Sequence, residues 1–92
     1  MELKYESERI YINDPVTGIP EAEIFFPKGS DGIHNITHTI VGKNLQGHGV
    51  AGLLTLAAAE KIRSEGKKTR LTCSYAVKWF AKHPEYNDIV VE

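Results

Sequence analysis

The chain has 92 residues and a mass of 10.3 kDa, so we expect residues 1–92 to form a single domain. Hydrophobic residues make up 41% and charged residues 25% of the sequence, a balance typical of a folded protein and not of a disordered one. Eleven Lys and Arg against twelve Asp and Glu give a net charge of −1. The basic excess of a nucleic-acid-binding protein is absent, and no nucleic-acid partner is expected.

The single cysteine, Cys73, excludes an intramolecular disulfide and a zinc finger, and no metal site is expected. A free thiol is typical of a reducing compartment, and the first residues, MELKYESER, lack the apolar segment of a secretion signal. The longest mostly apolar stretch, 50–59, is shorter than the roughly 20 residues of a membrane span. These features predict a cytoplasmic protein without a membrane partner.

The first half of the chain predicts three strands. Residues 1–7 are polar, and we expect them to fray. Polar and apolar residues alternate over 8–13, which predicts a half-buried strand, and 19–27 read as its returning partner. The turn between them, 14–18, contains a proline that sets φ and a glycine that permits positive φ. Residues 33–41 are rich in β-branched side chains and predict the strongest strand.

The hydrophobic period becomes helical in the second half. Gly66 is suited to end the first helix, Ser74 to cap the second, and His83-Pro84 to stop it. The elements expected after a loop over 42–48 are a helix over 50–65, a strand over 69–73, a helix over 75–82 and a short strand over 88–91.

This order predicts an α+β (mixed α/β) fold, in which an antiparallel strand meander precedes a right-handed β-α-β crossover and a second short helix. The crossover runs from strand 33–41 through helix 50–65 to strand 69–73, so these two strands should pair in parallel.

A glycine-rich segment between the best strand and the best helix carries the strongest functional signal. Three glycines within six residues let the backbone approach a ligand closely, and the helix N-terminus offers free N–H groups to a phosphate. The alternative is a tight turn that binds nothing. The segment consists of Gln46, Gly47, His48, Gly49, Val50, Ala51 and Gly52.

Two common phosphate motifs do not fit this segment. Gly47-x-Gly49-x-x-Gly52 has the dinucleotide spacing, but three strands precede it and no acidic residue ends the next strand, where Leu71–Ser74 stand. A P-loop is excluded because no Gly-Lys-Ser/Thr follows the glycines.

The segment matches another pattern. Gln46-x-x-Gly49-x-Ala51 resembles the Gln/Arg-x-x-Gly-x-Gly/Ala motif of the GNAT N-acetyltransferases. His38-Thr39, Cys73-Ser74-Tyr75 and His83-Pro84-Glu85-Tyr86 extend the resemblance to the short, single-domain branch of that superfamily. The similarity covers about residues 8–90.

The resemblance implies a GNAT fold and an acetyl-CoA-dependent transfer to a primary amine. Coenzyme A would lie where strands 33–41 and 69–73 diverge, with its pyrophosphate on the glycine segment. The main chain of Thr39, Ile40 and Val41 would bind the pantetheine arm. Lys78, on the second helix, could reach the nucleotide phosphates, or be an ordinary solvated lysine.

Three side chains are candidates for catalysis, each with a structural alternative. His38 could deprotonate the amine, because imidazole titrates near neutral pH, or be a half-buried strand residue. Cys73 could accept the acetyl group first, or be an inert small residue. Tyr75 could protonate the departing thiolate, or pack. His34, roughly 13 Å along the same strand face from His38, is expected at the surface.

Two functions remain open on this sequence. The first is an N-acetyltransferase, and the second is a non-catalytic module that binds or senses acyl-CoA through the same segment. A plain interaction domain would require the glycine segment to be empty. The sequence does not identify the acceptor amine, which could belong to a small molecule or to a protein. We expect a monomer or weak dimer.

Overall fold

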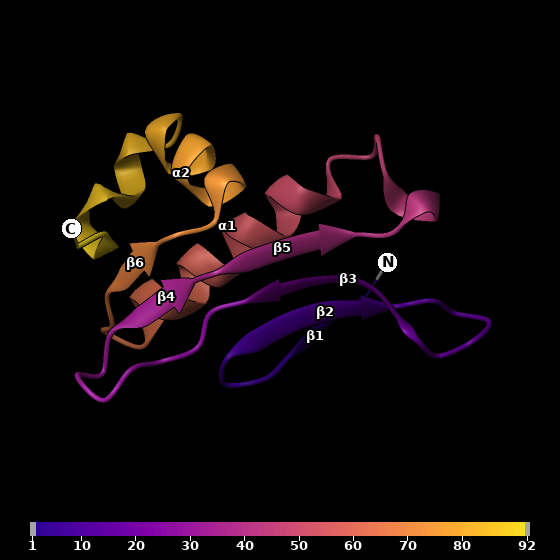
Figure 1. The fold of residues 1–92 in the computed structure, drawn as a ribbon, viewed down its shortest axis with the longest axis horizontal. Helices are drawn as coiled ribbons and strands as arrows, with labels where there is room; N and C mark the ends of the chain where they lie inside the picture. The colour runs from indigo at the N-terminus through magenta and orange to yellow at the C-terminus, as the bar shows by residue number, and fades with distance from the viewer. Residues whose placement is uncertain (1, 92) are drawn as a thin grey trace.

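The computed structural model describes residues 2–91 (Figure 1). Four strands form an antiparallel sheet in the order β1-β2-β3-β5, and β4 pairs in parallel with β6. The elements are β1 (Leu3–Tyr5), β2 (Arg9–Asn13), β3 (Pro20–Phe25), β4 (His34–Ile36), β5 (His38–Val41), the 3-10 turn η1 (Lys43–Leu45), α1 (Val50–Ser64), β6 (Thr69–Leu71), α2 (Ser74–Ala81) and the 3-10 segment η2 (Pro84–Ile89). This α+β arrangement, with its parallel β4–β6 pair, confirms the predicted fold class.

The hairpin β2–β3 forms as predicted. Asp14 Oδ1 accepts hydrogen bonds from the N–H groups of Val16 and Thr17, and Gly18 completes the turn at φ 73°. Ile10 lies opposite Ile24 across the ladder, and both are fully buried. Cross-strand apolar pairs of this kind hold the register.

The expectation of a frayed start was wrong. Leu3–Tyr5 form an edge strand against β2, with Leu3 opposite Ile12 and Tyr5 opposite Ile10. Leu3 packs on the core, so pairing to a neighbouring strand orders a segment whose own composition is polar.

The predicted single strand over 33–41 is divided by a bulge at Thr37. His34 lies opposite Lys28 and His38 opposite Phe25, so four steps on this strand match three on its partner. One extra residue reverses which side chains face the core. His34 is therefore 2% exposed and donates its Nδ1 proton to the Phe26 carbonyl at 2.7 Å, whereas His38 is exposed. The expectation of a surface His34 on the same face as His38 was wrong.

The parallel pair ends where the two chains separate. The N–H groups of Thr72 and Cys73 both donate to the carbonyl of Ile36, at 3.1 and 3.0 Å. After this point the chain of β6 turns into α2, while β5 continues along β3 (Figure 1). The strand predicted over 69–73 therefore ends at Leu71.

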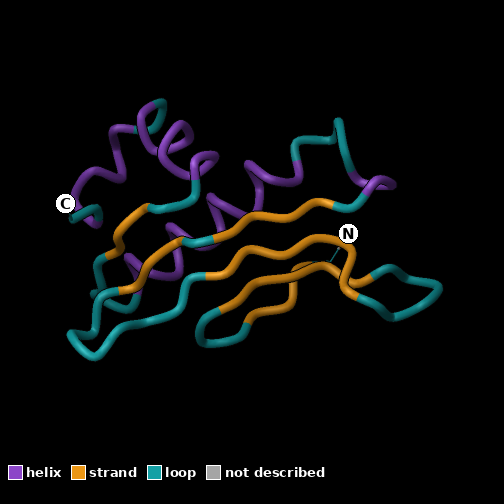
Figure 2. The backbone as a smooth tube through the Cα atoms, in the orientation of Figure 1, coloured by secondary structure: helices purple, strands orange, loops and turns teal. Residues whose placement is uncertain are grey.

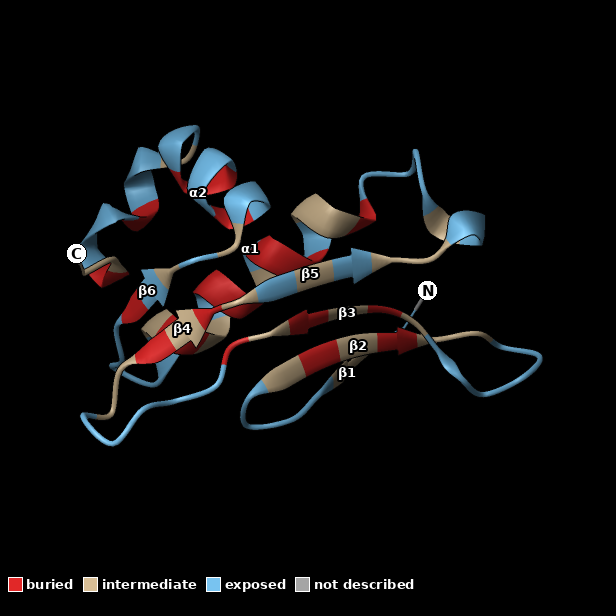
Figure 3. Cartoon of the chain, in the orientation of Figure 1, coloured by how far each residue is buried: buried red, intermediate tan, exposed pale blue. Residues whose placement is uncertain are grey.

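Helix α1 matches its prediction to within one residue and covers one face of the sheet. Val50, Leu54, Ala58 and Ile62 form its buried stripe, which is red in Figure 3. In Figures 1 and 2 the helix passes behind β4 and β5, and no described helix lies in front of the four-stranded sheet. Gly66, at φ 69°, ends the helix as predicted, with its N–H donated to the Arg63 carbonyl at 3.0 Å.

Two C-terminal boundaries differ from expectation. Cys73, and not Ser74, is the N-cap residue of α2. Residues 88–91 make no strand, because Pro84 starts a 3-10 segment that buries Tyr86 against α1, and only Val90 bridges to β6. His83 stops α2 as expected, with Nδ1–H donated to the Trp79 carbonyl at 2.6 Å.

Candidate functional site

The glycine loop, residues 46–52, presents free backbone donors at the start of α1. Gly47 and Gly49 have φ values of 82° and 72°, which side chains disfavour, and Gly49 is the N-cap residue. No side chain caps this helix, so the first N–H groups, from Val50 to Gly52, have no intrahelical acceptor. Uncompensated N–H groups at the positive end of a helix favour an anion such as pyrophosphate.

A cavity of about 210 Å³ lies against this loop. Tyr75 reaches over from α2, and its hydroxyl lies 3.3 Å from where a Cβ on Gly52 would stand. A side chain at position 52 would therefore press on Tyr75. Residues that line this loop cavity include Val41, Gln46, Gly47, Gly49, Gly52 and Tyr75.

Gln46 ties the loop to the sheet. Its Nε2 donates to the Val41 carbonyl at 3.1 Å, across the turn made by η1. His48 is exposed between the two positive-φ glycines. The shape of the loop thus rests on one side-chain bond and two glycine conformations. His48 contributes its backbone N–H to the loop.

One edge of β5 faces the chain that diverges from it after β6. Among residues 2–91, no strand pairs with this edge. The other edge pairs with β3, and the Gly42 N–H donates to the Glu21 carbonyl there at 2.7 Å. Because backbone groups alternate along a strand, Thr39 and Val41 direct theirs to the open edge. Of the three residues predicted to bind an extended arm, these two have main-chain groups at the open edge, although Gln46 occupies the Val41 carbonyl. Ile40 does not, because its groups face Glu23 of β3.

Cys73 lies at this open edge. Its Sγ is 3.7 Å from Thr39 Oγ1, and the residue is half-buried at the start of α2. The structure therefore brings Cys73 to the predicted arm-binding strand, and Tyr75 to the glycine loop. Lys78 is exposed three residues beyond Tyr75 on α2, with no contact that fixes its role.

His38 lies on the opposite side of the sheet from α1. Its ring meets Phe25 edge to face at a centroid distance of 6.4 Å, and both border a cavity of about 420 Å³. We call this the outer cavity. Its lining includes Glu6, Glu8, Arg9, Phe25, Pro27 and His38.

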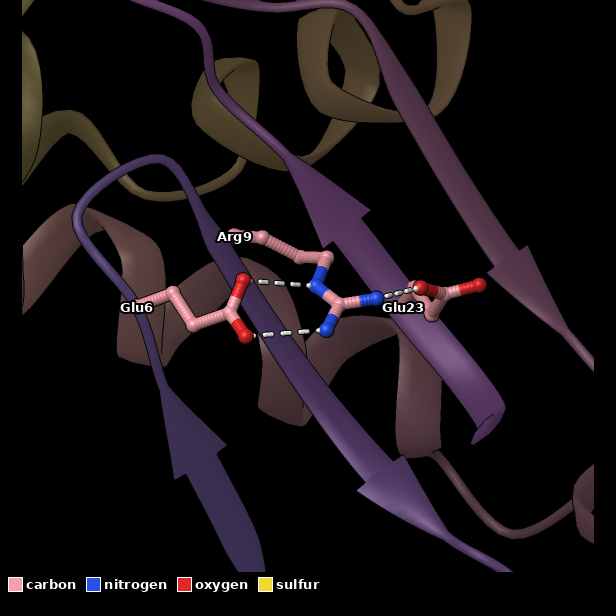
Figure 4. Close-up of polar contacts among 3 residues, drawn as sticks. All are labelled: Glu6, Arg9 and Glu23. Atoms are coloured by element: carbon pink, nitrogen blue, oxygen red, sulfur yellow. Dashed lines mark hydrogen bonds and ion pairs between the residues drawn. The ribbon is translucent and has the colours of Figure 1, made fainter. Parts of the chain in front are cut away.

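Sequence reasoning missed the charged residues of the outer cavity. Arg9 donates to both oxygens of Glu6 at 3.0 Å and to Glu23 at 2.7 Å (Figure 4). The hydrogen bonds to Glu6, and then to Glu23, raise the pKa of the Arg9 guanidinium. The available signal was an acid and a base three residues apart, with Glu6 in the segment expected to fray and Arg9 in the predicted strand over 8–13.

Two further classes of feature were searched for in residues 2–91. No helix there is both long and apolar enough to cross a membrane. No cluster of three or more His, Cys, Asp or Glu side chains in the same residues could hold a metal ion.

The fold and the loop define a class of protein, and comparison with known proteins agrees. Residues 9–89 match the family model described as GCN5-related N-acetyl-transferase, so the chain belongs to this family and is a GNAT domain. A comparison with curated proteins gives no significant match.

Two solved structures have a similar fold. One is the NMR structure of a GCN5-like candidate N-acetyltransferase from Staphylococcus aureus, with 31% identity and a TM-score of 0.76 over 98% of this chain and 87% of that one. The other is a ribosomal-protein-alanine N-acetyltransferase from Brucella melitensis biovar Abortus 2308, with 18% identity and a TM-score of 0.50 over 95% of this chain and 66% of that one. The second likeness concerns the fold alone.

Proposed function

We propose that residues 1–92 act as one acyl-CoA-binding unit that transfers the acetyl group of acetyl-CoA to a primary amine. Family membership supports the reaction class. The observation that supports acetyl-CoA as the cofactor is the uncapped, glycine-rich N-terminus of α1, which faces a cavity beside the open edge of β5. A reducing, cytoplasmic setting agrees with the single free thiol.

In this proposal each predicted residue has a place on the cofactor. The N–H groups of the glycine loop bind the pyrophosphate, and the main-chain groups of Thr39 and Val41 at the open edge of β5 bind the pantetheine arm. Lys78 approaches the nucleotide phosphates from α2. The uncharged, glycine-rich loop and the unpaired strand edge are the two features of this chain that fit such a ligand.

The transfer itself requires one bond to form and one to break. The amine nitrogen attacks the thioester carbonyl carbon, the C–S bond breaks, and the pair of electrons leaves on sulfur. His38 accepts the proton that the amine loses, and Tyr75 returns a proton to the thiolate. Cys73 offers a two-step route, in which its own sulfur takes the acetyl group before the amine does.

The test is a calorimetric titration of the reduced protein with acetyl-CoA, with NAD as the control ligand. We expect saturable one-to-one binding of acetyl-CoA and none of NAD. The absence of both heat and a thermal shift with acetyl-CoA would overturn the proposal. Binding without product from any amine would instead favour the non-catalytic acyl-CoA module.

Cys73 gives a separate prediction. Incubation with acetyl-CoA and no amine should add the mass of one acetyl group to the protein, and Cys73→Ala should remove that addition while changing acetyl-CoA affinity by less than about twofold. Intact-mass analysis at neutral pH measures both. If Cys73→Ala transfers acetyl groups to an amine at the original rate, the two-step route is wrong and direct attack remains.

A further inference from the structure

We propose that the outer cavity is the acceptor site, and that it takes a primary ammonium group carried on a flexible alkyl stem. This inference rests on the proposed acetyltransferase function and adds the place and the chemical class of the acceptor. It is carried by a cavity of about 420 Å³ that brings His38, two carboxylates and an apolar wall together.

The cavity exists because two distant parts of the chain meet. The bulge at Thr37 turns His38 away from the core, onto the face that α1 leaves open. The turn between β1 and β2 brings Glu6, Glu8 and Arg9 to the same place. The outer cavity therefore borders the first residue of β5, while the loop cavity borders its last residue, Val41. The amine and the nucleotide would approach opposite ends of one strand.

The charge of the cavity favours a cation. Arg9 is the only base besides His38 among the lining residues, and its guanidinium is already held by Glu6 and by Glu23. Glu8 uses one oxygen to accept the Lys28 N–H at 2.8 Å, and no positive side chain pairs with it among residues 2–91. The lining thus has two carboxylates against one guanidinium, and an anionic acceptor would be repelled.

The apolar wall of the outer cavity favours an acceptor whose ammonium group is carried on an alkyl stem. Phe25 and Pro27 line the cavity beside the carboxylates. Alkyl stems of long cationic side chains cover apolar surface of this kind while the charged end stays with polar groups. An ω-amino group on several methylenes, from a lysine side chain or a free diamine, matches both the carboxylates and the apolar wall of the cavity.

The proposed site also supplies the proton chemistry. An alkylamine binds as the ammonium ion, because its pKa lies near 10, and must lose a proton before nitrogen can attack. His38 lines the cavity and accepts that proton. When the amide has formed, the products are the acetylated amine, the free coenzyme A thiol and one released proton.

Binding is tested by NMR titration of the reduced protein. The probes are Nα-acetyl-lysine methylamide and 1,5-diaminopentane, and the control is Nα-acetyl-norleucine methylamide, which has the stem without the ammonium group. We expect the amides of Ser7, Arg9, Phe25 and His38 to shift with the two amines and not with the control. Equal shifts with all three probes, or shifts confined to residues 46–52, would overturn the proposal.

The matching variant is Glu8→Gln, which removes the charge and keeps an oxygen for the Lys28 N–H. We expect KM for either amine to rise about 1.5- to fivefold, as for one exposed ion pair, with the affinity for acetyl-CoA unchanged. Glu85→Gln, an exposed change on η2, is the matched control and should leave KM as it is.

The outcomes separate this proposal from the function on which it rests. If the protein does not bind acetyl-CoA, the proposed function is rejected. The amine titration alone then shows whether the outer cavity binds an ammonium group. Binding of acetyl-CoA with an unchanged amine KM in Glu8→Gln rejects the acceptor site only. Stronger turnover of the lysine derivative indicates a protein side chain as the source of the amine, and stronger turnover of the diamine indicates a small molecule.

Discussion

Replacing His38 by alanine should lower kcat/KM for the amine by about a hundredfold or more, which is the usual contribution of a general base. The affinity for acetyl-CoA should not change, because His38 borders the outer cavity and not the loop cavity. Steady-state kinetics with varied amine at saturating acetyl-CoA measures the first quantity, and a calorimetric titration with acetyl-CoA measures the second.

Two controls distinguish a chemical role of His38 from a structural one. The side chain is exposed, so the melting temperature of His38→Ala should stay close to that of the unchanged protein. Added imidazole should restore part of the rate, and the limb of the pH profile that reports the base should disappear. A full rate in the variant, or a loss that follows a loss of folded protein, contradicts the assignment.

Gly49→Val should weaken acetyl-CoA binding by about ten- to a hundredfold. Valine at φ 72° costs about 1–2 kcal/mol, and relief of that strain would turn the N–H groups at the start of α1 away from the ligand. Nothing lies within 4 Å of a Cβ at this position, so the effect comes from the backbone and not from a steric clash.

The chain contains a matched control for Gly49. Gly18 has nearly the same φ, 73°, equally open surroundings, and a place in the β2–β3 turn far along the chain from the loop. Gly18→Val should lower the free energy of unfolding by about as much as Gly49→Val does, because the backbone strain is the same. It should leave the affinity for acetyl-CoA unaltered. Chemical denaturation and calorimetry on both variants test this. Equal loss of affinity in the two variants would show that strain anywhere in the fold, and not the loop, controls binding.

Local features of this protein were predictable because their causes are local. The spacing of Val50, Leu54, Ala58 and Ile62 dictates a helix, and Gly66 ends it within a few residues of chain. The glycine loop lies between a strand and a helix in the sequence itself. The parallel β4–β6 pair follows from the crossover that any strand–helix–strand unit makes.

The remainder required contacts between distant segments. Whether residues 33–41 run straight or bulge depends on how their length matches 25–28, so the burial of His34 and the exposure of His38 were beyond local reasoning. Pairing with β2 orders Leu3–Tyr5, and packing on α1 replaces an expected strand by η2. The sequence by itself determined the helices, the loop and the family to which the chain belongs. Only the tertiary structure decided which face each histidine takes and where the outer cavity forms, because both depend on strand pairings that no short segment contains.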